Sequence, residues 1–263
     1  MAERTGGDRL WGTLGLAGLA AGWSLIHTTA GPFVLPSLAD TGTALIRVIA
    51  DGSALAGLAL TCLHAVGGAV AGAAVGLALG LAGGAVRPLG AALAPAVTAI
   101  LGVPPVAWIV LAFLWFGTGP AAPLFTVAIA TAPLLFAATL AGVRARDPAL
   151  IEMATVFRLP RATRFFRLTL PELAVQVAPA LSSAFAMAWK VALTAEVLGD
   201  GSGVGGRFAT ARAHLDLAEA MAWIVLVVAV LLTIDAVLFG PLRRRIDPAT
   251  PATRDGTDDG ERR

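Results

Sequence analysis

The hydrophobic pattern of the chain consists of long apolar runs separated by short polar segments. A membrane-spanning helix needs about 20 mostly apolar residues. Six windows meet this condition, at about 10–29, 57–84, 91–116, 121–142, 176–198 and 218–240. Between the first two, Leu38, Leu45 and Ile49 fall near one helical face, which predicts a short helix at the membrane interface. The pattern predicts an all-α polytopic membrane protein with about six transmembrane helices.

Composition supports this prediction and excludes several classes of protein. Hydrophobic residues make up 57% of the chain, charged residues only 14%, and the mean hydropathy is +0.80. Soluble domains carry roughly a quarter charged residues, so this chain has too few to coat a soluble globule. The net charge of +2 gives no reason to expect nucleic acid. Cys62 is the only cysteine, which excludes an intramolecular disulfide and a zinc site built on cysteine clusters.

The distribution of Lys and Arg predicts the orientation in the membrane. With the N-terminus in the cytoplasm and six alternating spans, Arg47, Arg207 and Arg212 are the only basic residues on the outer side. Lys190 lies within the fifth span, and every other Lys or Arg falls on the cytoplasmic side. Cytoplasmic loops of membrane proteins are enriched in these residues. We therefore expect a multi-pass membrane protein with both termini in the cytoplasm.

The chain divides into three expected regions. Residues 1–53 hold the first apolar helix, which we expect to be uncleaved, and the interfacial segment. Residues 54–245 form the core, and residues 246–263 are a polar, proline-containing tail that we expect to be disordered. In the core, Gly68, Gly72, Gly76 and Gly80 recur at four-residue spacing. Small residues at this spacing favour close packing of two helices, and lining of a pore is the alternative.

One cytoplasmic segment, within 143–175, is dense in charge although its surroundings are apolar. It contains "IEMATVFRLPRATRFFRLTLPE", residues 151–172, with two prolines and four arginines. Such a segment can anchor to anionic lipid, bind nucleic acid or dock a soluble partner. The specific order of acidic, apolar and basic residues favours two short helices that dock a partner. Nothing else in the chain supports nucleic-acid binding.

The spacing of this segment resembles the "EAA" loop of permease subunits in bacterial binding-protein-dependent ABC importers. That pattern is E-A-A, three residues, G, nine residues and I-x-L-P. Here it is Glu152-Met153-Ala154, three residues, Arg158, nine residues and 168–171. Met153 for Ala is a mild departure, whereas Arg158 for Gly brings a strain cost if the turn needs a positive φ. The resemblance implies that the loop docks the ATPase through Glu152, Met153, Ala154, Arg158, Pro160, Arg161, Phe165, Phe166, Leu170 and Pro171.

The resemblance covers about 54–245, and it implies the ABC type I importer permease fold. "VPPVAWIVLAFLWFGTGP" and "WKVALTAEVLG", with "FVLPS" ahead of that region, are similar to the nitrate, sulfonate and taurine branch. The resemblance implies a homodimeric permease of the bacterial inner membrane that works with two ATP-binding subunits and an extracytoplasmic solute-binding protein. The implied substrate is a small oxyanion or organic sulfonate. Alternatives are another small solute, such as a thiamine-precursor-like molecule, or a non-ABC channel or secondary transporter.

Two charged residues of the fifth span are candidates for the substrate path. Lys190 lies near mid-depth, where a charge is costly unless it faces water or a partner. Its expected role is a positive potential that favours an anion, and the alternative is a structural pair with Glu196 across a dimer. We expect His64 to be a packed or hydrogen-bonded helix residue. The sequence shows no catalytic constellation, no metal-ligand spacing and no cofactor motif, and "GDGSGVGG", residues 199–206, lacks the strand that a dinucleotide fingerprint must follow.

Overall fold

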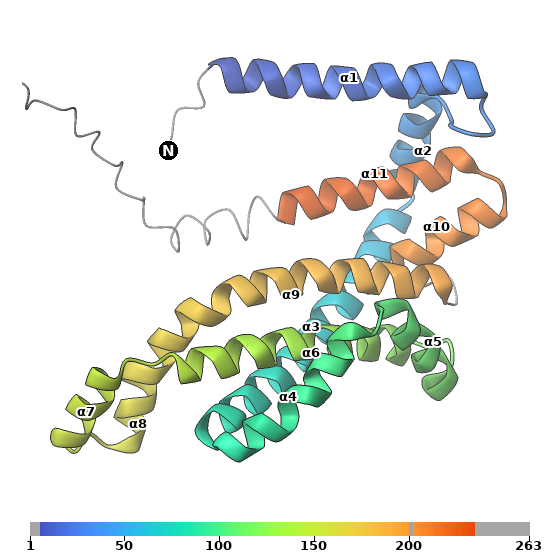
Figure 1. Ribbon diagram of the computed structural model, residues 1–263. Helices are drawn as coiled ribbons and strands as arrows, with labels where there is room; N and C mark the ends of the chain where they lie inside the picture. Colours follow the sequence, from blue (N-terminus) through green and yellow to red (C-terminus); the bar gives the residue numbers. More distant parts are fainter. Residues whose placement is uncertain (1–5, 200–201, 235–263) are drawn as a thin grey trace, which may run out of the picture. The chain divides into compact units, whose positions relative to one another are not determined.

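The computed structural model describes residues 6–199 and 202–234, and within these ranges it contains helices and no strand (Figure 1). The predicted tail at 246–263 and the end of the sixth window lie outside them. Residues up to Val228 form one compact unit, and Ala229 begins a second, of which only the last turns of α11 are described. The helices are α1 (Gly6–Ala30), α2 (Leu38–Ala50), α3 (Ser53–Ala85), α4 (Arg87–Gly102), α5 (Pro105–Phe116), α6 (Ala121–Arg144), α7 (Pro148–Val156), α8 (Arg161–Arg164), the π-helix η1 (Phe165–Thr169), α9 (Leu170–Leu198), α10 (Gly203–Ala213) and α11 (Leu217–Ile234).

Helices α3 and α6 pack closely along most of their length, and the glycine repeat lies at their contact. A Cβ atom added at Gly68 would lie 2.5 Å from Val127 Cβ, and one added at Gly80 would lie 2.5 Å from Thr139 Cβ. Positions further along α3 therefore meet positions further along α6, so the two helices run parallel. The packing role expected of the glycines is confirmed.

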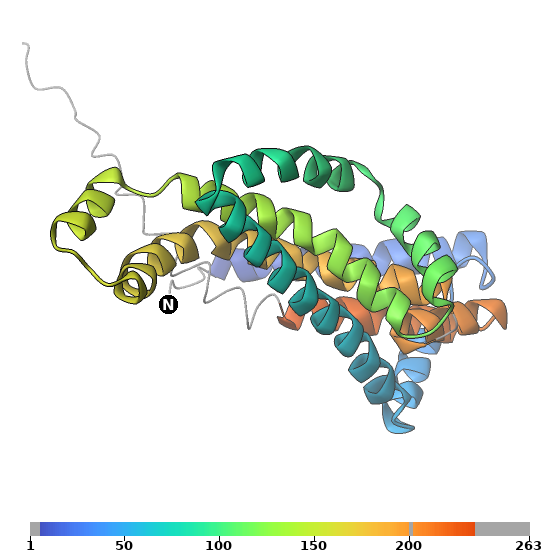
Figure 2. The same ribbon diagram turned by 90° about the horizontal axis from the view of Figure 1, so that it is seen from below.

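The third predicted span is not a straight helix. The structure breaks it after Gly102, and α4 and α5 meet at an angle of 96° (Figure 2). The cause is the Pro104–Pro105 pair, because a proline cannot donate to the preceding turn and restricts the residue before it. Since α3 and α6 run parallel, the chain must return between them. The bent α4–α5 pair therefore makes one return crossing instead of a straight span.

Helix α9 packs against α6 and α3 and runs antiparallel to both. Near its start, Leu173 meets Gly142 at the end of α6, and near its end Glu196 meets Thr61 at the start of α3. Figure 1 accordingly shows α7 and α8 at one end of α9 and α10 at the other. We call the end of α9 beside α7 and α8 the loop end, and the end beside α10 the cap end.

Among the described residues, four helices are long and apolar enough to cross a membrane, or five if the bent pair counts as one span. The four are α3, α6, the stretch that contains α9, and α11. Helix α1 covers the first predicted window, as expected, but is less apolar than these and is not among them. Helix α2 forms where the interfacial helix was predicted, with Ser37 as its N-cap and Val48 among its buried residues.

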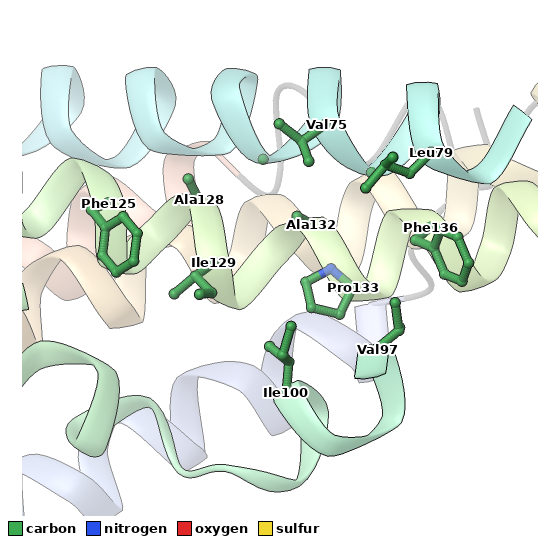
Figure 3. Close-up of a pocket in the computed structure, with 12 residues that line it drawn as sticks. Val75, Leu79, Val97, Ile100, Phe125, Ala128, Ile129, Ala132, Pro133 and Phe136 are labelled. Atoms are coloured by element: carbon green, nitrogen blue, oxygen red, sulfur yellow. The ribbon is translucent and has the colours of Figure 1, made fainter. Parts of the chain in front are cut away.

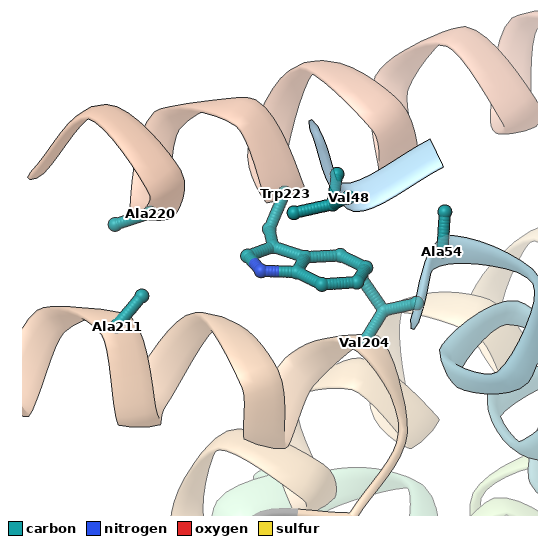
Figure 4. Packing of buried hydrophobic residues seen from close by; sticks show 6 residues of the cluster. All are labelled: Val48, Ala54, Val204, Ala211, Ala220 and Trp223. Atoms are coloured by element: carbon teal, nitrogen blue, oxygen red, sulfur yellow. The ribbon is translucent and has the colours of Figure 1, made fainter. Parts of the chain in front are cut away.

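A small hydrophobic cluster, the cap, joins four helices at the cap end. Trp223 of α11 is fully buried at its centre (Figure 4). Its indole nitrogen donates to Glu219 Oε1 at 3.2 Å, which satisfies the only polar atom of the ring. The cap consists of Val48, Ala54, Val204, Ala211, Ala220 and Trp223. Burial of an aromatic ring of this size stabilises the contacts among α2, α3, α10 and α11.

Candidate functional site

The charged segment folds as a helix, a tight turn and a second helical stretch. Asp147 caps α7, because its carboxylate accepts a hydrogen bond from the Ala149 amide at 2.8 Å. At the other end the Leu159 amide donates to Ala154 O at 3.0 Å, and the Arg158 amide donates to Thr155 O at 3.1 Å. This pair of bonds is the Schellman arrangement, which places the residue after the cap in the left-handed region.

That left-handed residue is Arg158, with φ of +48°. It occupies the glycine position of the motif, so the turn keeps the backbone that favours glycine although the residue has changed. A left-handed conformation costs a residue with a Cβ atom about 1–2 kcal/mol. The anticipated strain is therefore present, and Pro160 does not remove it. Instead, Pro160 is the N-cap residue of α8.

The second half of the loop differs from the separate short helix that the sequence predicted. Helix α8 continues through η1 into α9, and Pro171 lies in the first turn of α9. Pro171 is tolerated because the preceding turn is a π-helix, in which the Leu170 amide bonds Phe165 O rather than the usual carbonyl. The loop is thereby joined to α9 without a hinge of irregular chain.

Two contacts hold the loop against the ends of α6 and α9. Arg146 donates from Nε to Val143 O at 2.9 Å and from Nη1 to Thr169 Oγ1 at 3.2 Å. Ala154, the last residue of the acidic motif triplet, is 2% exposed, so α7 also packs inward. These contacts brace α7 and η1 on the bundle at a defined position.

The outward surface of the loop combines apolar side chains with charge. Phe166 is 63% exposed and packs edge-to-face on Phe165, with ring centroids 5.2 Å apart. Val156 and Phe157 are each 71% exposed, and the sequence interpretation did not include them. Their position in the sequence, directly before the glycine position of the motif, was the signal that could have identified them. Of the residues that the sequence predicted to dock the ATPase, all except Ala154 are exposed, namely Glu152, Met153, Arg158, Pro160, Arg161, Phe165, Phe166, Leu170 and Pro171.

The two candidates for the substrate path occupy different environments. Lys190 is exposed and has no ion-pair partner among the described residues. Glu196 is 1% exposed and lies in the protein interior. Its carboxylate finds its partners within its own chain, so neither an open path nor a pair with Lys190 accounts for it. The carboxylate of Glu196 makes a different set of contacts.

These contacts form a buried polar network that joins three helices. Glu196 Oε1 of α9 lies 2.8 Å from His64 Nδ1 of α3. Glu196 Oε2 accepts hydrogen bonds from the Thr61 hydroxyl at 2.8 Å and from the Gly205 amide at 3.0 Å. The Thr61 hydroxyl also accepts from the Val204 amide at 2.9 Å. His64 is hydrogen-bonded, as expected, although its Nε2 atom is buried without a partner.

The network explains the glycine-rich segment at the start of α10. Gly203 has a φ of +64°, and a Cβ atom there would overlap the Glu196 carboxylate. A Cβ atom at Gly205 would lie 2.5 Å from Leu193 O and 2.8 Å from Glu196 Cβ. The glycines therefore allow the α10 backbone to approach a buried carboxylate of its own chain, not a dinucleotide phosphate.

A cavity of about 360 Å³ lies between α3, α4 and α6 (Figure 3). Its lining is entirely apolar and includes Val75, Ile100, Phe125, Ile129 and Phe136. Such a lining offers no hydrogen-bond donor to an oxyanion, and Lys190 is not part of it. The cavity therefore does not supply an anion site.

Comparison with known sequences supports the permease family that the charged loop resembles. Residues 74–250 match the family of "Binding-protein-dependent transport system inner membrane component" proteins. A putative aliphatic sulfonates transport permease protein, SsuC of Escherichia coli K12, is 32% identical over 113 residues, which are 43% of this chain and 43% of that protein. A probable ABC transporter permease of Brucella melitensis biotype 1 is 26% identical over 196 residues, which are 74% of this chain and 79% of that protein.

Solved structures of similar fold include two ABC transporters. The chain matches a crystal structure of an amino acid ABC transporter with a TM-score of 0.60 and 20% identity, over 76% of this chain and 97% of the other. It also matches an inward-facing MetNI methionine ABC transporter with a TM-score of 0.52 and 16% identity, over 72% and 92%. At identities this low, the TM-scores show a shared fold and nothing further. The family match extends over most of the chain, which therefore belongs to the inner-membrane permease components of binding-protein-dependent ABC transport systems.

Proposed function

We propose that this permease forms, as a homodimer, the translocation path of an ATP-driven importer for a small oxyanion or organic sulfonate. Two ATP-binding subunits would dock at the loop end, and a solute-binding protein would dock at the cap end. Closure of the ATPase subunits would move the two loops and switch the path between inward-facing and outward-facing states. ATP hydrolysis belongs to the separate ATPase subunits.

The observation that carries the proposal is the docking loop itself. A loop that only anchored to lipid would not need a capped helix, a Schellman turn and braces from Arg146. These features fix the direction in which Phe157 and Phe166 face. Exposed aromatic side chains on a rigid support are typical anchors of protein interfaces. The arginines around them would steer association with an acidic rim on the partner.

The substrate class rests on two weaker observations. One of the relatives, SsuC, has a name that assigns it to aliphatic sulfonates. Lys190 gives the fifth predicted span an exposed positive charge without an ion-pair partner in the described ranges. An exposed positive charge within a membrane span favours an anion over a cation or a neutral solute.

The orientation follows from the same geometry. The loop end carries Arg144, Arg146, Arg158 and the arginines of 161–167, whereas the described residues of the cap end include three arginines, Arg47, Arg207 and Arg212. Positive charges favour the cytoplasmic side. We therefore place the loop end in the cytoplasm, where an ATPase is available, and the cap end outside.

Co-expression and reconstitution test the function. The chain would be purified with a candidate ATP-binding subunit and solute-binding protein, placed in liposomes, and assayed for uptake of labelled taurine, an alkanesulfonate or nitrate. The proposal predicts a stable complex and uptake that requires ATP and the binding protein. Uptake without the ATPase subunit would instead support a channel or secondary transporter. ATP-dependent uptake of a cation or neutral solute alone would refute the substrate class.

A further inference from the structure

The Glu196 network lies at the cap end of α9, and α9 is directly continuous with the docking loop at its other end. The helix has 29 residues, so it is about 43 Å long at 1.5 Å per residue. It packs along α6 over much of this length, which resists bending at Pro179. Helix α9 can therefore transmit a displacement of the loop to the position of Glu196.

At that position one carboxylate joins α9 to two other helices. Glu196 contacts His64 and Thr61 of α3 and the Gly205 amide of α10. The side chains of Glu196, His64 and Thr61 are each at most 1% exposed. Separation of the three helices would leave a buried charge without its partners, which is strongly unfavourable. The closely approaching glycines of α10 leave no room for the carboxylate to slide to a second position.

We infer that Glu196 is a positioning residue that makes the ends of α3 and α9 and the start of α10 move as one body during transport. The inference rests on the proposed function, because it needs a motor at the loop end. Motion of the docking loop is transmitted along α9, and the carboxylate transfers it to α10 and hence to the cap. Without the carboxylate, the loop and α9 still move, but α10 does not follow.

The opposite mechanism is a latch that opens in each cycle. An opening latch would need exposure to water, or a second set of partners for the carboxylate in the open state. The structure shows neither: three partners occupy both oxygens, and the Thr61 hydroxyl is itself fixed by the Val204 amide. The burial of the whole network favours a permanent joint.

A disulfide that fixes α10 on α3, which packs against α9, distinguishes these mechanisms. A Cβ atom added at Gly57 of α3 would lie 3.4 Å from Val204 Cγ2 of α10, so we choose Gly57→Cys with Val204→Cys, in a Cys62→Ser background, as the pair to cross-link. The cysteine pair would be introduced into a chain that keeps Glu196, which we call the parent, and into the same chain with Glu196→Ala. Each would be reconstituted in liposomes as the full complex. Uptake and ATP hydrolysis would be measured in the oxidised and reduced forms. Glu196→Gln is the conservative variant, because its amide oxygen can still accept from Thr61 and Gly205.

For Glu196→Ala we expect hydrolysis within about twofold of wild type and uptake per ATP lowered about tenfold, a typical size for coupling between sites. Oxidation of the cysteine pair should restore uptake by the Glu196→Ala variant and leave uptake by the parent unchanged. The Glu196→Gln variant should keep most of the coupling between ATP hydrolysis and uptake. A disulfide that blocks uptake in the parent, or equal losses in Glu196→Gln and Glu196→Ala, would overturn the inference. If Glu196→Ala fails to assemble, the disulfide in the parent still decides. Absence of ATP-dependent uptake in the wild-type complex would refute the proposed function instead.

Discussion

Substitution of Gly80 by alanine tests the packing of α3 against α6. The new Cβ atom would lie 2.5 Å from Thr139 Cβ, 2.9 Å from Thr139 Cγ2 and 3.0 Å from Phe136 O. Because β-branched Thr139 and a backbone carbonyl surround the position, the clash can be relieved only by separation of the two helices. Overpacking of this kind costs about 1–3 kcal/mol. Alanine also raises helix propensity by about 1 kcal/mol relative to glycine.

The expected net effect of Gly80→Ala is therefore a loss of about 0–2 kcal/mol. Gly42→Ala in α2 is the matched control, because Gly42 is helical and a Cβ atom there would meet nothing within 4 Å. That variant should gain about 1 kcal/mol from propensity alone. Both would be compared with wild type by denaturant unfolding in mixed micelles, followed by tryptophan fluorescence. A Gly80→Ala protein as stable as the Gly42→Ala protein would refute the close contact.

Four further predictions concern single positions. Arg158→Val should destabilise the loop by about 1 kcal/mol relative to Arg158→Gly, because a β-branched residue tolerates the positive φ least, and thermal unfolding would show it. Cysteines at Val156 and Leu215, exposed by 71% and 76%, should label from opposite sides of the membrane, Val156 from the cytoplasm; labelling from one side would contradict the orientation. Lys190→Met should impair anion uptake without loss of assembly, and Lys190→Arg should keep part of it; unchanged uptake by the Met variant would make the charge dispensable. The hydrogen bonds from Ser53 hold the pKa of Asp51 below its usual value of 3.8. The stability that they contribute is therefore present above pH 3.8 and is lost as the pH falls through the lowered pKa. The difference in unfolding free energy between wild type and Asp51→Asn, measured across this range, should vanish in acid.

Much of the fold could be predicted from the sequence because the membrane imposes a simple rule. Apolar length alone located α3, α6 and α9 to within a few residues, except at the start of α9, and the glycine repeat indicated a close helix contact. The bend between α4 and α5 was missed, although Pro104 and Pro105 mark it, because the hydropathy on both sides continues. The continuous passage from the loop into α9 through Pro171 was not predicted, since the π-helical turn that accommodates this proline has no sequence signal.

The site was predictable to different degrees in its two parts. The charged loop is local in sequence, so its resemblance to the family motif was enough to select Glu152, Ala154 and the glycine position now held by Arg158. The Glu196 network is not local, because His64 and Glu196 are separated by 132 residues. A charge within a span indicates that a partner must exist, but not which one. Only the antiparallel packing of α3 and α9 brings the two side chains together.

The central claim is that the loop of α7, α8 and η1 docks the ATPase subunit. The most direct measurement is the recovery of that subunit with Phe157→Ala/Phe166→Ala, beside Phe33→Ala as the control, since Phe33 is 86% exposed but lies far from the loop in sequence and between α1 and α2. Truncation of a central aromatic anchor typically costs about 2 kcal/mol or more, so the loop variant should lose at least about tenfold in affinity for the ATPase. The Phe33→Ala protein should bind it as wild type does. Normal recovery and normal ATP-driven uptake by the loop variant would contradict the account and leave the segment as a lipid anchor.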